Sequence, residues 1–307
     1  MAIKLGNASI SKLYLGSNEI SKAYLGANEV FSSGDTTSFI TTWRTTTSNE
    51  SITIPIIATS TYNYSITTSD GRTFNNISGG KTITFATAGD YDVSISGTFP
   101  RIYFNNGGDR TKLIDIKQWG NIVWSSFERS FYGCSNLVGS FTDAPNLTNV
   151  TDLSRAFLNC PSFNQPLNNW DVSNVTDMLG MFAGSVNATP VFNQPLNNWD
   201  VSNVTNMFAM FSNAKAFDQN ISDWDITSVT DFSSFSQRAT FSTTNYDAIL
   251  EDWEQTLQAA FPNGTGYTPN ISINFGNSQY TGGGAAATAR ASLVTNFGWS
   301  IVDGGIA

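Results

Sequence analysis

The sequence predicts a modular, mainly β protein, and three observations carry that prediction. A motif of about ten residues recurs over residues 1–31, short segments of alternating apolar and polar residues follow, and a unit of about 25 residues then recurs as far as residue 242. Long repeats each hide an apolar side against the next, so they stack into a solenoid. The expected order is β-hairpin repeats, a β-sandwich, the solenoid with short helices, and a C-terminal cap.

Composition excludes several classes of function. The chain has 307 residues, a formal net charge of −9 and no histidine. Its acidic balance leaves no basic surface for phosphate contacts, so we expect no nucleic-acid partner. Without histidine there is no Ser-His or Cys-His nucleophile pair, and two cysteines cannot form a four-cysteine zinc site. We therefore expect a protein that is not an enzyme and has no catalytic residue, cofactor or metal site.

The beginning of the chain carries no export signal. Residues 1–7 lack an apolar stretch and a small-residue cleavage site, and no apolar run is long enough for a membrane helix. We expect no membrane insertion. A polar, β-rich composition without an export signal suggests a protein that is assembled in a cytoplasm and exposed later, as virion proteins are.

Residues 1–31 contain three similar units, which begin at Leu5-Gly6, Leu15-Gly16 and Leu25-Gly26. Each unit places apolar residues around a turn, which predicts short β-hairpins or rungs of a small β-prism. Three such units have too little core to stand alone, so we expect them to fold on a partner or in an oligomer. The segment resembles the Leu-Gly repeat at the N-termini of phage tail and fibre proteins, which implies docking to other virion proteins of the tail or capsid. An appendage without a special role is the alternative.

A linker is expected at residues 32–36 and a β-sandwich over residues 37–118, where strand-like segments alternate with turns. The order of Asp70-Gly71, residues 82–85 and residues 88–93 resembles polycystic-kidney-disease-type Ig-like modules. The family's usual Trp-Asp-Phe-Gly-Asp-Gly stretch is replaced here by residues 65–71. The resemblance implies an Ig-like spacer.

The solenoid is predicted over residues 119–242. Trp170, Trp199 and Trp224 occupy one repeat position, and a short insertion near residues 186–189 lengthens one coil. Within a coil, residues 170–175 suit an extended rung. Residues 176–182 suit a helical turn or two, because apolar side chains recur there at helical spacing.

Two phrases within the repeats match a known family. Residues 131–137 and 170–178 resemble the Phe-x-x-Cys-x-x-Leu and Trp-Asp-Val-Ser-Asn-Val-Thr-Asp-Met phrases of BspA-like leucine-rich-repeat surface proteins and of the related mycoplasma-type lipoprotein repeat. The resemblance implies a leucine-rich-repeat-type solenoid used for adhesion or ligand binding, without catalytic positions. Residues 243–307 are the expected cap, with amphipathic helices over residues 246–257 and 285–297.

Several repeated side chains could bind something or only support the fold. Acidic residues recur in two columns, Asp171, Asp200 and Asp225 in one and Asp152, Asp177 and Asp231, with Asn206 between, in the other. We favour hydrogen bonds to turns and helix ends, with cation binding and sugar contacts as alternatives. The tryptophans are expected in the core rather than in a sugar-stacking stripe. Cys134 and Cys160 share one small position, which predicts buried, unlinked thiols.

Together these features predict a non-enzymatic phage virion protein, a tail fibre or similar exposed fibre at the virion surface, that attaches to its host through the solenoid. Expected partners are host cell-surface glycan or protein, other virion proteins and further copies of the chain in a homo-oligomer. A bacterial cell-surface or secreted adhesin and a capsid-decoration protein are alternatives. The predicted receptor contacts are polar neighbours of the tryptophan position: Asn169, Asp171, Asn198, Asp200, Asp223 and Asp225.

Overall fold

The computed structural model describes residues 35–307 in full and, within residues 1–34, the backbone of short strands. By contacts the chain divides into two compact units, residues 1–37 and residues 38–307. Strands of the first unit pair antiparallel into hairpins, β1 with β2, β3 with β4 and β5 with β6, as the sequence predicts. Their bounds are β1 Lys4–Leu5, β2 Ala8–Ser9, β3 Leu13–Leu15, β4 Asn18–Ile20, β5 Lys22–Leu25 and β6 Asn28–Ser32.

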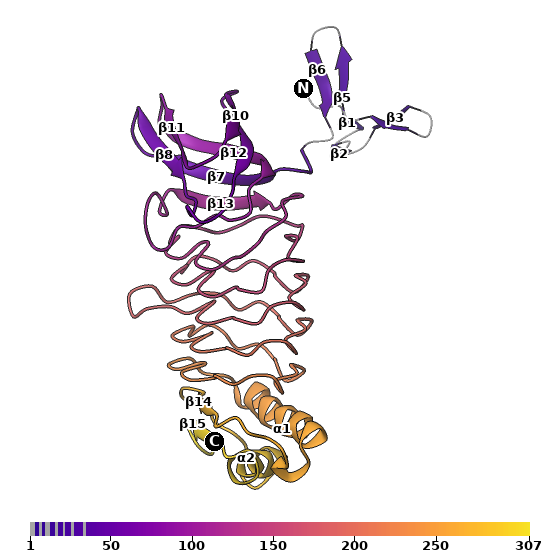
Figure 1. Ribbon diagram of the computed structural model, residues 1–307, viewed down its shortest axis with the longest axis vertical. Coiled ribbons are helices and arrows are strands. Elements are labelled where there is room, and N and C mark those ends of the chain that lie inside the picture. The colour runs from indigo at the N-terminus through magenta and orange to yellow at the C-terminus, as the bar shows by residue number, and fades with distance from the viewer. Residues whose placement is uncertain are drawn as a thin grey trace. The chain divides into compact units, whose positions relative to one another are not determined.

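The second unit begins with two antiparallel sheets (Figure 1). The larger has the strand order β10-β9-β12-β7-β13, and the smaller pairs β11 with β8. Alternate residues of β9 are buried (Tyr64, Ile66 and Thr68), as expected for a strand with one face on a core. The bounds are β7 Phe39–Thr45, β8 Glu50–Ile54, β9 Asn63–Thr68, β10 Thr73–Ile77, β11 Lys81–Phe85, β12 Gly89–Thr98 and β13 Leu113–Gln118.

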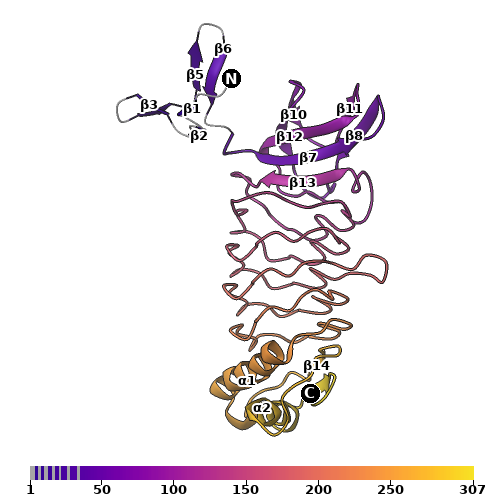
Figure 2. The same ribbon diagram turned by 180° about the vertical axis from the view of Figure 1, so that it is seen from behind.

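Residues 119–242 form a stack of coils, called here the coil stack, which both views show as successive loops of chain between the sheets and the helices (Figures 1 and 2). Every second N–H of one coil segment donates to a carbonyl of the next coil. Leu153 donates to Asp177 (2.9 Å), Arg155 to Leu179 (2.7 Å) and Phe157 to Met181 (3.0 Å). Isolated parallel bridges join equivalent residues of successive coils at Asp152, Asp177, Asn206 and Asp231.

The prediction of short helices inside the coils is wrong, because no helix occurs in residues 119–242, all of which the structure describes. Gly180 has a φ of 57°, and the equivalent Arg155 and Ala209 have φ values of 55° and 54°. A left-handed residue in each coil ends a helical turn as soon as it forms. The N–H groups that an α-helix would use internally donate to the next coil instead, and the apolar spacing is met by turns such as Met181 to Met178 (3.2 Å).

The expected extended rung at residues 170–175 is also wrong. Its end is a turn, in which Val175 donates its N–H to Val172 (2.8 Å). The β-bridge to the neighbouring coils lies two residues after Val175, at Asp177. Thr176, the first residue of the expected helical turn, donates its N–H (2.9 Å) and its hydroxyl (3.2 Å) to the carbonyl of Thr151 in the previous coil.

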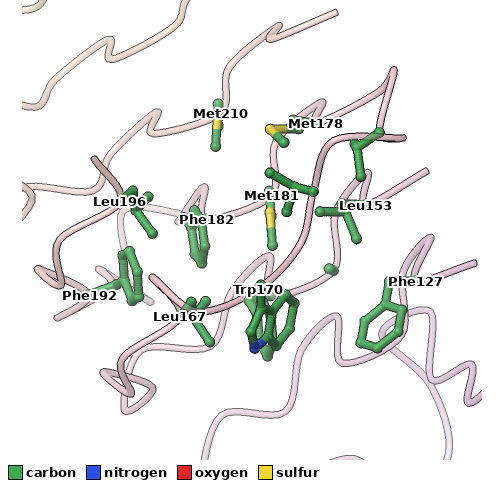
Figure 3. Packing of buried hydrophobic residues seen from close by; sticks show 14 of the residues in the cluster. Phe127, Leu153, Leu167, Trp170, Met178, Met181, Phe182, Phe192, Leu196 and Met210 are labelled. Atoms are coloured by element: carbon green, nitrogen blue, oxygen red, sulfur yellow. The ribbon is translucent and has the colours of Figure 1, made fainter. Parts of the chain in front are cut away.

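The interior of the coil stack is built from aromatic columns. Phe157, Phe182 and Phe211 come from successive coils and stack with ring centroids 6.0 and 5.7 Å apart. Each faces a second phenylalanine of its own coil, as Phe182 does Phe192 at 4.1 Å (Figure 3). Pairs stacked in this way add to the hydrophobic energy of burial, so each coil is fixed to its neighbours by side chains as well as by backbone.

The short insertion forms a hairpin on the side of one coil. Ser185 and Ala188 exchange both backbone hydrogen bonds (3.2 and 3.1 Å), and Val186 at the tip is 75% exposed. The hairpin projects from the coil stack in Figures 1 and 2. The prediction that the extra residues bulge out near residues 186–189 is confirmed.

The sheets and the coil stack share one core. The backbone N–H groups of Val138 and Ser140 in the first coil donate to the carbonyls of Ile114 and Ile116 in β13 (both 2.9 Å). Strand β13 is the edge strand of the larger sheet, and these bonds use its outer side. The ring of Phe39 on β7 lies 5.5 Å from Trp119. The edge of the sheet is therefore covered by the first coil.

The last coil is covered by helix α1 (Thr243–Ala260), whose buried face is Tyr246, Ile249, Leu250, Trp253 and Leu257. Beyond it lie the 3-10 turn η1 (Pro262–Gly264), strand β14 (Ser272–Asn274), helix α2 (Ala285–Thr295) and strand β15 (Ser300–Val302), which pairs parallel with β14. In the described residues strand outweighs helix, 22% to 12%, so the protein is mainly β as predicted. None of the described helices has the length and apolar character needed to span a membrane.

Candidate functional site

The tryptophan column lies in the core. Trp170, Trp199 and Trp224 are at most 3% exposed. The indole N–H of Trp199 donates to the carbonyl of Leu167 (2.9 Å), and that of Trp224 donates to Leu196 (3.0 Å). Rings at this depth cannot stack on a sugar, so the prediction of a core position is confirmed and the sugar-stacking alternative is wrong.

The first acidic column closes turns. Asp171, Asp200 and Asp225 are exposed, and in each the Oδ1 atom accepts both the N–H and the hydroxyl of the residue two positions on. At Asp200 the Ser202 hydroxyl (2.6 Å) and backbone N–H hold the pKa of the carboxyl below its ordinary value. The favoured assignment to turn hydrogen bonds agrees with these contacts.

The second acidic column follows the bridged residues. Asp152, Asp177, Asn206 and Asp231 each accept the N–H two positions on at 2.8 to 3.0 Å. The amide of Asn206 also donates to Asp177 (3.1 Å), which separates two carboxylates with an uncharged donor. Burial raises the pKa of Asp152. Within residues 35–307, no group of three or more histidine, cysteine or acidic side chains is placed to hold a metal ion.

Two of the six predicted receptor contacts line one groove. Asn169 and Asn198, from successive coils, lie on its wall, and the groove has a volume of about 610 Å³. The other lining residues are Ser140, Phe141, Thr142, Asp143, Gln165, Pro166 and Asn168. Asp171, Asp200 and Asp225 do not line it. Asp223 lies on a separate shallow depression beside Asp252 and Gln255 of α1.

The groove is held in shape by hydrogen bonds between coils. The carbonyl of the Asn168 side chain accepts the backbone N–H of Asn198 (2.9 Å), and its amide donates to Asn197 (3.1 Å). At the other end Asp143 accepts the backbone N–H groups of Trp119 (3.0 Å) and Gly120 (2.8 Å). These contacts fix the backbone on both sides, so the side chains of Asn169 and Asn198 stand on a rigid support. The side-chain oxygen of Asn198 also accepts the amide of Asn197 (3.3 Å), which leaves the amide N–H₂ of Asn198 to donate.

The lining of the groove combines apolar side chains with polar side chains that are uncharged, apart from Asp143. Phe141 is almost wholly buried and packs against Trp119 with centroids 5.3 Å apart, while Pro166 is exposed beside it. An amide side chain offers both a donor and an acceptor, which suits hydroxyl groups. Among the lining residues Asp143 is the acidic one, and its carboxylate already accepts backbone N–H groups. The lining therefore lacks the carboxylate pair on which glycoside hydrolysis depends.

The sequence contains a signal for this groove that extends over several neighbouring repeat positions and is not visible at any single one. The phrase Phe-Asn-Gln-Pro-Leu-Asn-Asn-Trp occurs at residues 163–170 and again at residues 192–199. Equivalent positions of stacked coils lie side by side, so a duplicated polar phrase predicts a duplicated polar surface. Phe141 and Thr142 could not be found in this way, because the coil that carries them departs from the repeat.

Fold and groove define a mainly β repeat protein with a recess on the side of its coils whose polar lining is uncharged except for Asp143. A family model described as "Mycoplasma protein of unknown function, DUF285" matches residues 125–253, less than half of the chain. The matched segment contains most of the coil stack and the first half of α1, in agreement with the mycoplasma-type repeat resemblance at that coarse level. No curated protein and no solved structure matches the chain.

Proposed function

We propose that this chain is a non-enzymatic phage virion protein, a tail fibre or similar exposed fibre, that attaches to the host surface through the groove on the coil stack. In this proposal residues 119–242 are a leucine-rich-repeat-type solenoid and residues 37–118 an Ig-like module of the polycystic-kidney-disease type. The target is a neutral, hydroxyl-rich group of a cell-surface glycan, with a host protein as the alternative target.

The observation that carries the proposal is the repetition of one amide in two neighbouring coils. Asn169 and Asn198 are exposed, occupy equivalent positions and line the same groove. Two amides set one coil apart can each bind a hydroxyl of a polymer that lies along the coil stack. Each contact is weak, so useful affinity depends on several groups and on several copies of the chain per particle.

Residues 1–31 are the proposed attachment to the particle. Their paired strands are only two to five residues long, and isolated hairpins of that size are marginal in water. In this proposal they gain stability by folding on another virion protein or on further copies of the chain in a homo-oligomer, and the protein lies at the virion surface. The rivals are a bacterial cell-surface or secreted adhesin and a capsid-decoration protein.

The binding proposal is tested with the full chain on a panel of bacterial cells and on an array of neutral glycans. The variant Asn169→Ala/Asn198→Ala should bind about tenfold more weakly, since two hydrogen bonds of about 1 kcal/mol each are removed and part of that loss is offset by water. The matched control is Asn121→Ala/Asn187→Ala, which truncates two exposed asparagines outside the groove. Equal binding by both variants and the unaltered chain contradicts the proposal.

The location is tested separately by electron microscopy of phage particles labelled with antibodies against the chain. Labelled tails or fibres support the fibre assignment, whereas labelled capsids favour decoration and labelled bacteria favour an adhesin. Flanking tail genes or an upstream signal peptide would separate the first and last of these. Removal of residues 1–31 should abolish incorporation while the melting temperature of the remaining unit stays unchanged.

A further inference from the structure

A second recess lies at the other end of residues 119–307, between the last coil and the strands of the cap. It has a volume of about 450 Å³ and is lined by Lys215, Gln237, Arg238, Asn274, Gly276, Asn277 and Val302. Two of these residues are cationic and none is acidic. In a chain with a formal net charge of −9, a recess of this composition is unusual.

Most other cations of the described residues are paired with an acid. Arg44 binds Asp90 (2.7 Å), and Arg290 binds Asp303 (2.7 Å). Arg72, Arg101, Lys112 and Lys117 likewise have carboxylate partners. Within residues 35–307, no carboxylate lies within ion-pair distance of Lys215 or Arg238. The positive charge of the recess is therefore not neutralised by those residues.

Arg238 has a left-handed backbone conformation, which arginine rarely adopts. Its φ is 67°, and the equivalent left-handed positions of earlier coils are filled by Gly133, Asn159 and Asn213. Glycine and asparagine adopt this conformation most readily. The guanidinium makes one long contact, to the side-chain oxygen of Asn213 (3.5 Å), and leaves its other N–H groups to the recess.

The rest of the wall suits a small organic anion. Asn274 accepts the N–H of Gly276 through its side-chain oxygen (2.8 Å), so its amide N–H₂ is the group left to donate. Val302 is 52% exposed and offers an apolar contact to carbon atoms beside the charge. Arginine and lysine together are the usual partners of oxyanions.

We infer that the recess around Lys215 and Arg238 is a binding site for an oxyanion, a carboxylate or a phosphate, carried by a sugar or a similar small polyol. It is a different site from the groove at Asn169 and Asn198 and does not depend on the function proposed there. Carboxylate and phosphate are distinguished by the test.

The test measures binding of glucuronic acid and of glycerol 3-phosphate to the full chain by NMR titration at low salt, with glucose as the uncharged probe. Either anion should bind, glucose should not, and the preferred anion identifies the group. Lys215→Gln and Arg238→Gln should each weaken binding at least tenfold. The matched control is Lys81→Gln, which removes one positive charge from outside the recess; among the described residues Lys81 has no carboxylate partner and lies over the ring of Phe74 (4.4 Å). Binding of neither anion, or an equal loss with Lys81→Gln, overturns the inference.

A second measurement needs no variant. Lys215 is exposed, so amine acylation followed by mass spectrometry reports its accessibility in the unaltered chain. The bound anion should slow acylation of Lys215 at least threefold and leave Lys81 unchanged. Equal rates at Lys215 with and without the preferred anion at saturation contradict the assigned site.

Discussion

Trp253 of α1 donates its indole N–H to the carbonyl of Ile221 (3.2 Å), the bond that Trp224 makes to Leu196 (3.0 Å) one coil earlier. The helix that ends the coil stack therefore occupies the tryptophan position of a further coil. The tryptophan column continues although the backbone changes from a coil to a helix. It needs only an indole ring in the core whose N–H can donate to the carbonyl one coil earlier.

The indole bond predicts a difference between two tryptophans. Trp224→Phe removes a donor from a buried carbonyl, whereas the indole N–H of Trp170 is buried and has no partner among the described residues. Both changes remove the same ring volume. Trp224→Phe should lower the free energy of unfolding by about 1 to 2 kcal/mol more than Trp170→Phe. Denaturant titration measures the difference, and equal losses contradict the assigned role.

The cysteines should be inert in the folded chain. Cys134 and Cys160 are buried and unlinked, as predicted, and the thiol of Cys160 donates to the carbonyl of Phe131 (3.0 Å). Burial raises the pKa of Cys160 to about 12 and raises that of Cys134 as well. Neither should react with iodoacetamide at pH 8 until the chain is unfolded. Non-reducing mass spectrometry that found a quantitative disulfide would sink the prediction.

The raised thiol pKa values also predict a dependence of stability on pH. A thiol that stays neutral in the folded state stabilises it fully below the unfolded pKa near 9, and this stability is lost as pH rises toward about 12. Cys134→Ala/Cys160→Ala should therefore lose less stability between pH 8 and pH 10.5 than the unaltered chain. Alanine already fills this position at Ala214, so the variant should fold. Parallel pH curves would exclude the effect.

Asn206 separates charges in its column. Asn206→Asp removes the hydrogen bond that the side-chain amide donates to Asp177. It also places a further carboxylate between those of Asp177 and Asp231. Stability at pH 7 should fall by about 1 to 2 kcal/mol. Much of that loss should be recovered at pH 4, since like charges raise the pKa of the carboxyls and protonation removes the repulsion. Asn187→Asp at the exposed hairpin tip is the control and should change stability little at either pH.

Substitution of Gly276 tests how closely the backbone of the cap approaches the backbone of the last coil at Ala239. Its φ is 64°, and a Cβ atom there would lie 2.0 Å from the carbonyl oxygen of Ala239. Gly266 has a φ of 84° with nothing within 4 Å of its Cβ position. Gly276→Ala should prevent folding of the cap or cost more than about 3 kcal/mol, whereas Gly266→Ala should cost about 1 kcal/mol. Thermal unfolding of both variants decides, and similar melting temperatures contradict the close approach.

The repeat spacing predicted the features that recur at one position of every repeat or interrupt that recurrence. It located the buried phenylalanines, the tryptophan column, the small position of Cys134 and the inserted hairpin, because each recurs or breaks a recurrence. It could not distinguish a helix from a turn at residues 176–182. The apolar residues Val175, Met178 and Phe182 satisfy both, and the choice is made by N–H groups that bond to another coil.

The sequence predicted receptor contacts and not a groove, and two of the six predicted residues line the groove. Asn169 and Asn198 follow from the tryptophan position, but four of the six chosen residues lie elsewhere, since a column of equivalent residues does not reveal where the surface is concave. That concavity depends on Phe141 and Asp143, which come from an irregular coil. Their position depends on contacts with Trp119 that no local pattern encodes.

The hydrogen bonds from Val138 and Ser140 to β13 limit where a coil can be added to such a chain. A coil added at either end would displace the strand or the helix that closes the stack and leave a row of backbone groups open to other chains. A coil duplicated in the middle would pack against another coil on each side. Growth by internal, in-frame duplication is therefore the tolerated route, and each event would lengthen the polar surface by one copy while both ends stay closed.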